Sequence, residues 1–189
     1  MLRNLLLLSI TLALSAQSKK EPELNIIEDA EAYNVYSAIL DMEKPKGELL
    51  IADTTVPFNQ CLDPHSDEPV DAAIQDYKKA NQNQWHVGYH FVSTQPYKLL
   101  SRKEANTLLQ RDRRTGDWSL SPYNGIHRFS AVGFSANKTI AFVEMDVVCG
   151  GLCGHGHPYI LQKKDGKWER YDFRWTKRTQ VPVICSWAY

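Results

Sequence analysis

Residues 149–158 constrain the fold of this chain more than any other segment. They contain two of the four cysteines, two of the six histidines and four glycines. Apolar runs typical of β-strands flank this stretch, at residues 140–149 before it and at residues 159–163 after it. Glycine adopts positive φ angles without strain, so a glycine-rich stretch between two strand patterns predicts a tight connecting turn.

The rest of the C-terminal third extends this turn into a series of hairpins. Turn signals at residues 136–139 and at Asp165-Gly166 separate segments with strand patterns. The predicted strands follow one another at residues 131–135, 140–149, 159–163 and 167–175. Consecutive strands joined by short turns pair antiparallel, so this part of the chain predicts a four-stranded meander.

The N-terminal half is richer in helical patterns. Apolar residues recur every three or four positions over residues 27–42, and further helices are predicted at residues 70–83 and 103–110. A short buried strand is predicted at residues 49–52, and strict alternation predicts another strand at residues 85–92. The sequence therefore predicts the α+β class: an antiparallel meander sheet of about four to five strands packed against N-terminal helices.

The start of the chain has the layout of a secretory signal peptide. Arg3 gives a positive beginning, residues 5–14 form an apolar run, and small or polar residues follow at 15–18. The run is too short to span a bilayer, although an uncleaved anchor is the alternative interpretation. The sequence predicts a signal peptide over residues 1–18, a single α+β domain over residues 19–189, and a secreted or periplasmic location.

The charges of the chain are balanced, with 22 basic and 22 acidic residues. Removal of residues 1–18 takes away Arg3 and no acid, which leaves 21 basic against 22 acidic residues. Neither a basic excess nor a basic face is visible, which argues against nucleic acid or an anionic membrane as the partner. No second long apolar run follows, so we expect no membrane association after cleavage. A protein or a small molecule remains as the ligand.

The cysteines predict disulfides, because exported proteins meet an oxidising compartment. Four thiols allow three connectivities, which the sequence alone does not resolve. We favour Cys149–Cys153 with Cys61–Cys185, since the glycine-rich stretch folds the first pair together easily. The long-range bridge would stabilise the fold by about 4–5 kcal/mol in the chain-entropy estimate.

A metal site is the alternative use of the same stretch. Cys149, Cys153, His155 and His157 are ligand types that suit zinc or copper. All four lie close together in the sequence and no second ligand pair follows, which is a poor match to common structural zinc sites. The glycines do not form a phosphate-binding loop either, because a strand pattern rather than a helix comes next. We therefore expect no metal and no cofactor.

Two further pairs of residues are candidates for chemistry. Glu144 and Asp146 leave the same face of the strand predicted at 140–149, where paired carboxylates can do acid–base work or hold a cation. We favour a solvated outer face for them, because the other face of this strand is apolar. His86 and His90 share one face of the strand predicted at 85–92, without a carboxylate partner in view. Ordinary surface histidines are the favoured interpretation.

Several segments of the chain resemble a group of exported bacterial proteins of unknown function. The similar segments are AVGFS at residues 131–135, KTIAFV at 138–143, CGGLCGHG at 149–156 and the hairpin DGKW at 165–168. The early segments 36–40 and 50–55 fit the same pattern. The resemblance implies an exported bacterial domain, and it implies no activity and no catalytic residues.

The sequence as a whole predicts a binding or accessory module, exported and stabilised by disulfides. No established catalytic motif is present, which is the reason for this interpretation. The alternative is a secreted hydrolase or metal-dependent enzyme whose site lies near His155, His157, Glu144 and Asp146.

Overall fold

The structure, a computed structural model, describes residues 23–45, 47–57, 68–115, 120, 123–150, 153–171 and 187–188. The predicted signal peptide, Cys61, Cys185 and most of the segment after Tyr171 lie outside these residues. Among the described residues there are three helices: α1 (Ala30–Glu43), α2 (Glu68–Ala80) and α3 (Arg102–Thr115). No helix in this part of the chain has both the length and the apolar character needed to cross a membrane.

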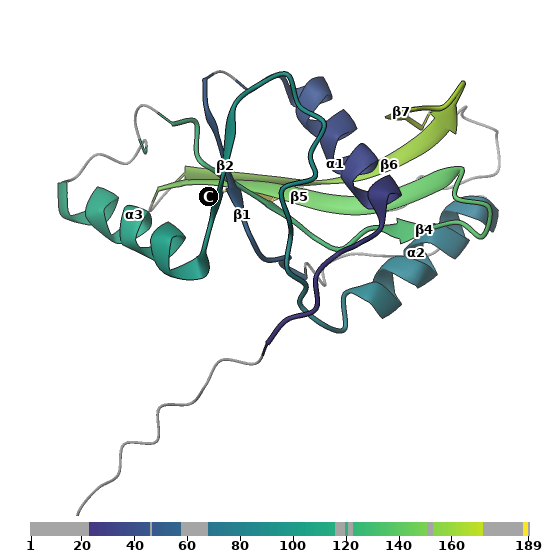
Figure 1. Cartoon of the computed structure of the whole chain (residues 1–189), viewed down its shortest axis with the longest axis horizontal. Helices are drawn as coiled ribbons and strands as arrows, with labels where there is room; N and C mark the ends of the chain where they lie inside the picture. The colour runs from purple at the N-terminus through teal and green to yellow at the C-terminus, as the bar shows by residue number, and fades with distance from the viewer. Residues whose placement is uncertain are drawn as a thin grey trace, which may run out of the picture.

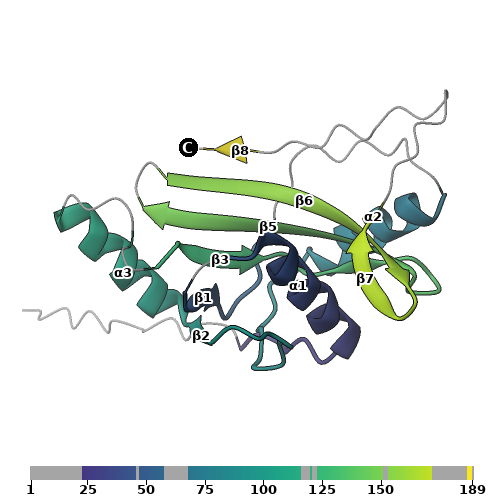
Figure 2. The ribbon, with the colours of Figure 1, turned by 90° about the horizontal axis from the view of Figure 1, so that it is seen from above.

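The described strands form one sheet of eight strands, ordered β2-β1-β3-β5-β6-β7, with β4 against β5 and β8 against β6. The strands are β1 (Leu49–Ala52), β2 (Tyr97–Leu100), β3 (Ile126–Phe129), β4 (Gly133–Phe134), β5 (Ile140–Gly150), β6 (Cys153–Lys164), β7 (Lys167–Arg170) and β8 (Trp187–Ala188). The long strands β5 and β6 lie side by side along the molecule (Figure 2).

The sheet is larger than the sequence predicts and it is partly parallel. β1 pairs in parallel with β2 and with β3, whereas the pairs from β3 onwards are antiparallel. The connections from β1 to β2 and from β2 to β3 contain α2 and α3, and parallel neighbours need such long crossovers. The mixed α and β class and the antiparallel meander from β4 to β7 are confirmed.

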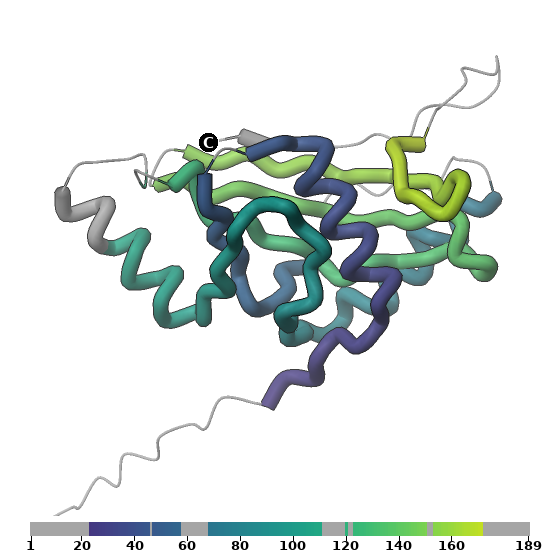
Figure 3. The backbone as a smooth tube through the Cα atoms, turned by 45° about the horizontal axis from the view of Figure 1, so that its top comes forward, coloured from purple at the N-terminus to yellow at the C-terminus, as the bar shows by residue number. Residues whose placement is uncertain are grey.

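The helices cover both faces of the sheet. Figures 1 and 3 show α1 on one face, and Figure 1 shows α2 and α3 at opposite ends of the other. Three apolar clusters fill the spaces between these layers. The largest joins α1 to the face that includes Val143 and Met145, a second lies under α2, and a third lies under α3. The core is therefore divided by the sheet, and each helix closes one part of it.

The first predicted helix is confirmed as α1. Asp29 caps its N-terminus by accepting a hydrogen bond from the Glu31 backbone N–H at 3.0 Å. Lys44 ends the helix in the left-handed conformation, at a φ of 46°. The buried side of α1 contains the residues with helical spacing, including Val35, Tyr36 and Ile39, as the apolar stripe predicts.

The strand predicted at residues 85–92 is wrong. Only His86 makes bridge pairings, with Ile26 on one side and Thr54 on the other, and the segment is otherwise without strand structure. Val87 and Phe91 are buried, but Tyr89 is 68% exposed. The segment crosses the end of β1. It does not form a strand there, because its bridge pairings stop at His86.

The glycine-rich stretch after Cys153 is part of a strand rather than a loop. His155, Gly156 and His157 each pair with a residue of β5, and the register shifts only between Val148 and Gly150. Glycine weakens a strand, but the pairing with β5 outweighs this effect, so β6 begins at Cys153 and not at residue 159 as the sequence predicts. The predicted hairpin turn at Asp165-Gly166 is confirmed, with φ angles of 50° and 78°.

Gly133 allows α2 to approach the sheet closely. A Cβ atom at this position would lie 2.2 Å from the Ala73 carbonyl oxygen and 2.2 Å from the Tyr77 backbone nitrogen. We expect Gly133→Ala to lower the free energy of unfolding by about 1–3 kcal/mol, because the helix backbone must move away. Gly88→Ala is the control, since its Cβ would meet mainly the movable His90 side chain. Equal losses in urea unfolding of the two variants would contradict this account.

Candidate functional site

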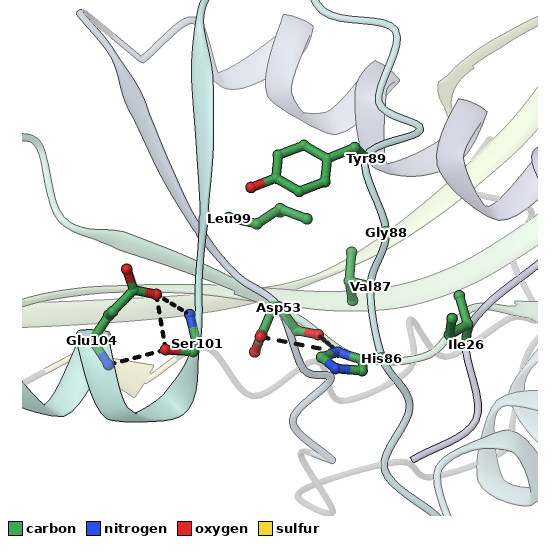
Figure 4. A pocket seen from close by; sticks show the side chains of 9 residues that line it. All are labelled: Ile26, Asp53, His86, Val87, Gly88, Tyr89, Leu99, Ser101 and Glu104. Carbon is green, nitrogen blue, oxygen red and sulfur yellow. Dashed lines mark hydrogen bonds and ion pairs between the residues drawn. The ribbon is translucent and has the colours of Figure 1, made fainter. Parts of the chain in front are cut away.

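A cavity of about 380 Å³ opens beside the end of β1 (Figure 4). Its lining combines carboxyl, imidazole and hydroxyl groups with apolar side chains: Ile26, Asp53, His86, Val87, Gly88, Tyr89, Leu99, Ser101 and Glu104. A volume of this size, with a few polar groups on a partly apolar wall, is typical of a small-molecule site.

The parallel strands place the polar groups of the cavity. Asp53 follows the last residue of β1, and Ser101 follows the last residue of β2 and precedes α3. The Asp53 N–H donates to the Leu100 carbonyl at 2.9 Å, which holds the two strand ends together. Side chains at the carboxyl ends of neighbouring parallel strands meet at one edge of the sheet, which is where ligands bind in many sheets of this kind.

The backbone around His86 is fixed from two sides. Its N–H donates to the Asn25 carbonyl at 2.7 Å, and its carbonyl accepts from the Ile27 N–H at 2.9 Å. The ring atom Nδ1 lies 2.7 Å from the main-chain carbonyl oxygen of Asp53. Because a carbonyl can only accept, we assign the ring proton to Nδ1, which leaves a lone pair on Nε2 in the neutral imidazole.

Asp53 has an unusual carboxylate. Its atom Oδ2 lies 4.0 Å from His86 Nδ1, and its atom Oδ1 is buried without a hydrogen-bond partner among the described residues. Burial raises the pKa of this carboxyl above its usual range, and the nearby His86 opposes the rise. The side chain is still 20% exposed, so a cationic ligand in the cavity can reach the carboxylate and balance its charge.

Glu104 occupies the N-terminal end of α3. Its Oε2 accepts from the Ser101 N–H at 2.9 Å, and Ser101 Oγ accepts from the Glu104 N–H at 3.2 Å. This reciprocal pair is a capping box. The backbone hydrogen bond from Ser101 is the main reason why the pKa of Glu104 is lowered. The carboxylate therefore already fills the position at which the helix terminus would attract an anion.

The structure separates the four residues that the sequence marks as a combined site. In β5 and β6, His155 pairs with Val147 and His157 pairs with Met145, so both histidines share the face of these apolar residues. Glu144 and Asp146 alternate with them and point to the opposite face. One ligand cannot contact both pairs without passing through the sheet.

Glu144 and Asp146 are buried, so the solvated outer face predicted for them is wrong. Their exposed fractions are 6% and 1%. α2 packs over Phe142, next to Glu144 on the same face of β5. The Tyr77 hydroxyl of α2 donates to Glu144 Oε2. The Arg128 guanidinium binds both oxygens of Asp146, with Nε 2.8 Å from Oδ1. These contacts give both acids structural partners.

Burial affects the protonation of both acids. It raises the pKa of Glu144 to about 7, against the opposing hydrogen bond from Tyr77. It also raises the pKa of Asp146, although the Arg128 hydrogen bonds oppose the rise. The side chain of His127 in β3 lies on the opposite face of the sheet from the two acids. Burial lowers the pKa of His127, because burial disfavours the charged imidazolium.

The disulfide Cys149–Cys153 is present, as the sequence predicts. The second predicted bridge, Cys61–Cys185, lies outside the described residues. Within the part of the chain that the structure describes, no three His, Cys, Asp or Glu side chains are grouped to hold a metal ion.

Sequence reasoning did not find the cavity, although signals for it exist. Asp53 directly follows a buried apolar strand, which is the position of many ligand-binding acids. The sequence shows no carboxylate partner for His86. In the structure the nearby carboxylate is that of Asp53, which lies 33 residues away in the sequence. His90, paired with it in the sequence interpretation, instead packs its ring at 5.0 Å from the ring of Tyr33.

Comparisons with known proteins add no relative. No protein-family model, no curated protein and no solved structure matches this chain.

Proposed function

We propose that this protein is an exported binding module that takes a small organic cation, such as an amine, in the cavity beside Asp53. The observation on which this rests is the Asp53 carboxylate, which lines the cavity with 20% of its side chain exposed and has no Lys or Arg partner among the described residues. An ammonium group would donate a hydrogen bond to the exposed part of this carboxylate and balance its charge.

The other groups of the cavity suit the same ligand. Glu104 adds a second negative charge to the lining, although Lys98 Nζ at 3.4 Å balances part of it. The exposed ring of Tyr89 can pack on a cation through its negative face. Leu99 and Val87 are apolar and fit the hydrocarbon part of an amine. An anion would meet two carboxylates, so it is the less suitable ligand.

Export is the second part of the proposal. The disulfide Cys149–Cys153 supports it, because structural disulfides persist in oxidising compartments and are rare in the cytosol. The signal-peptide pattern of residues 1–18 points to the same secreted or periplasmic location.

The test is binding of simple amines to the full chain. We expect calorimetric titration to detect binding of butylamine or tetramethylammonium but not of neutral butanol. Asp53→Asn should weaken binding of the amine about tenfold to a hundredfold, because a hydrogen bond to a charged group contributes about 1.5–3 kcal/mol. Asp41→Asn, at an exposed position of α1, is the matched control.

Two results would refute the amine site: no binding of any amine in the panel, or equal binding by wild type and Asp53→Asn. The alternative function, a hydrolase or metal-dependent enzyme acting near His155, His157, Glu144 and Asp146, is less well supported, because these pairs face opposite sides of the sheet. Chemical conversion of a ligand that is lost with Glu144→Gln but retained with Asp53→Asn would favour that alternative.

A further inference from the structure

His155 and His157 form a pair of exposed imidazole side chains that the cavity does not use. Gly156 separates them on β6, so their side chains extend from the same face, and both are exposed. Their ring centres are 5.6 Å apart, with the ring planes at 49°. The two buried acids of β5 lie on the other face and take no part.

We propose that these two imidazoles bind a divalent transition-metal ion, with copper(II) preferred over zinc(II). Metal–nitrogen bonds are about 2.0–2.1 Å, so two adjacent imidazoles have ring centres about 4.5 Å apart on a square-planar copper(II) ion and about 5 Å apart on a tetrahedral zinc(II) ion. The observed 5.6 Å is about 1 Å or less from either separation. Since both side chains are exposed, small rotations about their χ angles bring the ring nitrogens onto one ion.

The backbone that displays the histidines pairs with β5 at both residues, and with β8 at His155. His155 pairs with Val147 of β5 and with Ala188 of β8, and His157 pairs with Met145. The disulfide Cys149–Cys153 closes the turn two residues before His155. Ligands on a rigid strand lose little freedom on binding, which favours chelation over binding to two mobile histidines.

The chemistry of the donors selects the metal. Imidazole nitrogens suit copper, nickel and zinc, whereas calcium and magnesium prefer oxygen ligands. The Irving–Williams order places copper(II) above zinc(II) for such a pair. The disulfide occupies both nearby thiols, and no third His, Cys, Asp or Glu among the described residues is grouped with the two histidines.

The experiment is titration of the disulfide-intact full chain with copper(II) alone and then zinc(II) alone, against a competing chelator. We expect one copper ion per chain at this site, with nitrogen hyperfine couplings in its electron paramagnetic resonance spectrum. His155→Gln and His157→Gln should each weaken copper binding by about tenfold or more. His90→Gln removes an exposed histidine elsewhere and should leave it unchanged.

The variant that lacks both histidines is the decisive test of the copper site. If His155→Gln/His157→Gln binds copper as tightly as the wild type and keeps the same spectrum, the proposal is overturned. The melting temperature of the metal-free double variant should match the wild type, since both side chains are exposed. Because Asp53 lies outside β5 and β6, amine binding should persist in this variant, which separates the two sites.

Discussion

Arg128→Met is expected to lower the free energy of unfolding by about 3–5 kcal/mol, because it leaves a buried carboxylate without its counter-charge. The side chain of Asp146 is 0% exposed, while that of Arg128 is 33% exposed. The guanidinium contacts both carboxylate oxygens in a bidentate arrangement. Methionine keeps much of the apolar stem, so the loss reports mainly the missing charge and hydrogen bonds.

Urea unfolding at pH 7 measures this loss, and two variants control it. Arg170→Met removes an exposed ion pair with Glu43, where the distance is 3.1 Å, and should cost less than about 1 kcal/mol. Asp146→Asn added to Arg128→Met should recover part of the loss, since it removes the buried charge. If Arg128→Met and Arg170→Met cost the same, the buried pair does not have the role assigned to it.

Glu144→Gln is expected to remove much of the pH dependence of stability between pH 4.5 and pH 7. In the folded protein the pKa of Glu144 is about 7, against an ordinary value of 4.5. The folded state therefore binds this proton more tightly than the unfolded state does. Its contribution is fully present below pH 4.5 and is lost as the pH rises through 7, by about 3 kcal/mol in total.

The measurement is the free energy of unfolding of wild type and Glu144→Gln at a series of pH values. The difference between them isolates Glu144 from Asp146, whose buried carboxyl contributes in the same direction. Glutamine still accepts from the Tyr77 hydroxyl, so packing of α2 is kept. Glu169→Gln, at an exposed position of β7, should follow the wild type. Parallel curves for wild type and Glu144→Gln would contradict the raised pKa.

The elements with strong local patterns were predictable from the sequence. The apolar stripe of α1 and the hairpin turn at Asp165-Gly166 depend on interactions between residues close in sequence. β1 pairs with distant strands but is recognisable as an uninterrupted apolar run between turn signals. β2 and β3 were missed. Each has only four residues and pairs in parallel with a strand distant in the chain, so no local alternation identifies it.

The candidate site was less predictable than the fold. His86 was visible as a histidine, but its interaction with Asp53 arises only where the segment after α2 crosses the end of β1. Glu144 was assigned to a solvated face because its strand has one clearly apolar side. α2 packs over the other side as well, where Ile140 and Phe142 share the face of Glu144. These two apolar residues are the signal in β5 for burial on both faces.

The sequence by itself determined the existence of the three helices and the hairpin turn at Asp165-Gly166, and it favoured the disulfide Cys149–Cys153, because backbone propensities and short loops act locally. Only the tertiary structure decided which faces of the sheet are covered, which strands are parallel and which acids are buried. The environment of Asp53, Glu144 and Asp146 is set by segments that meet across the whole chain. Their desolvation and partners are therefore properties of the assembled fold.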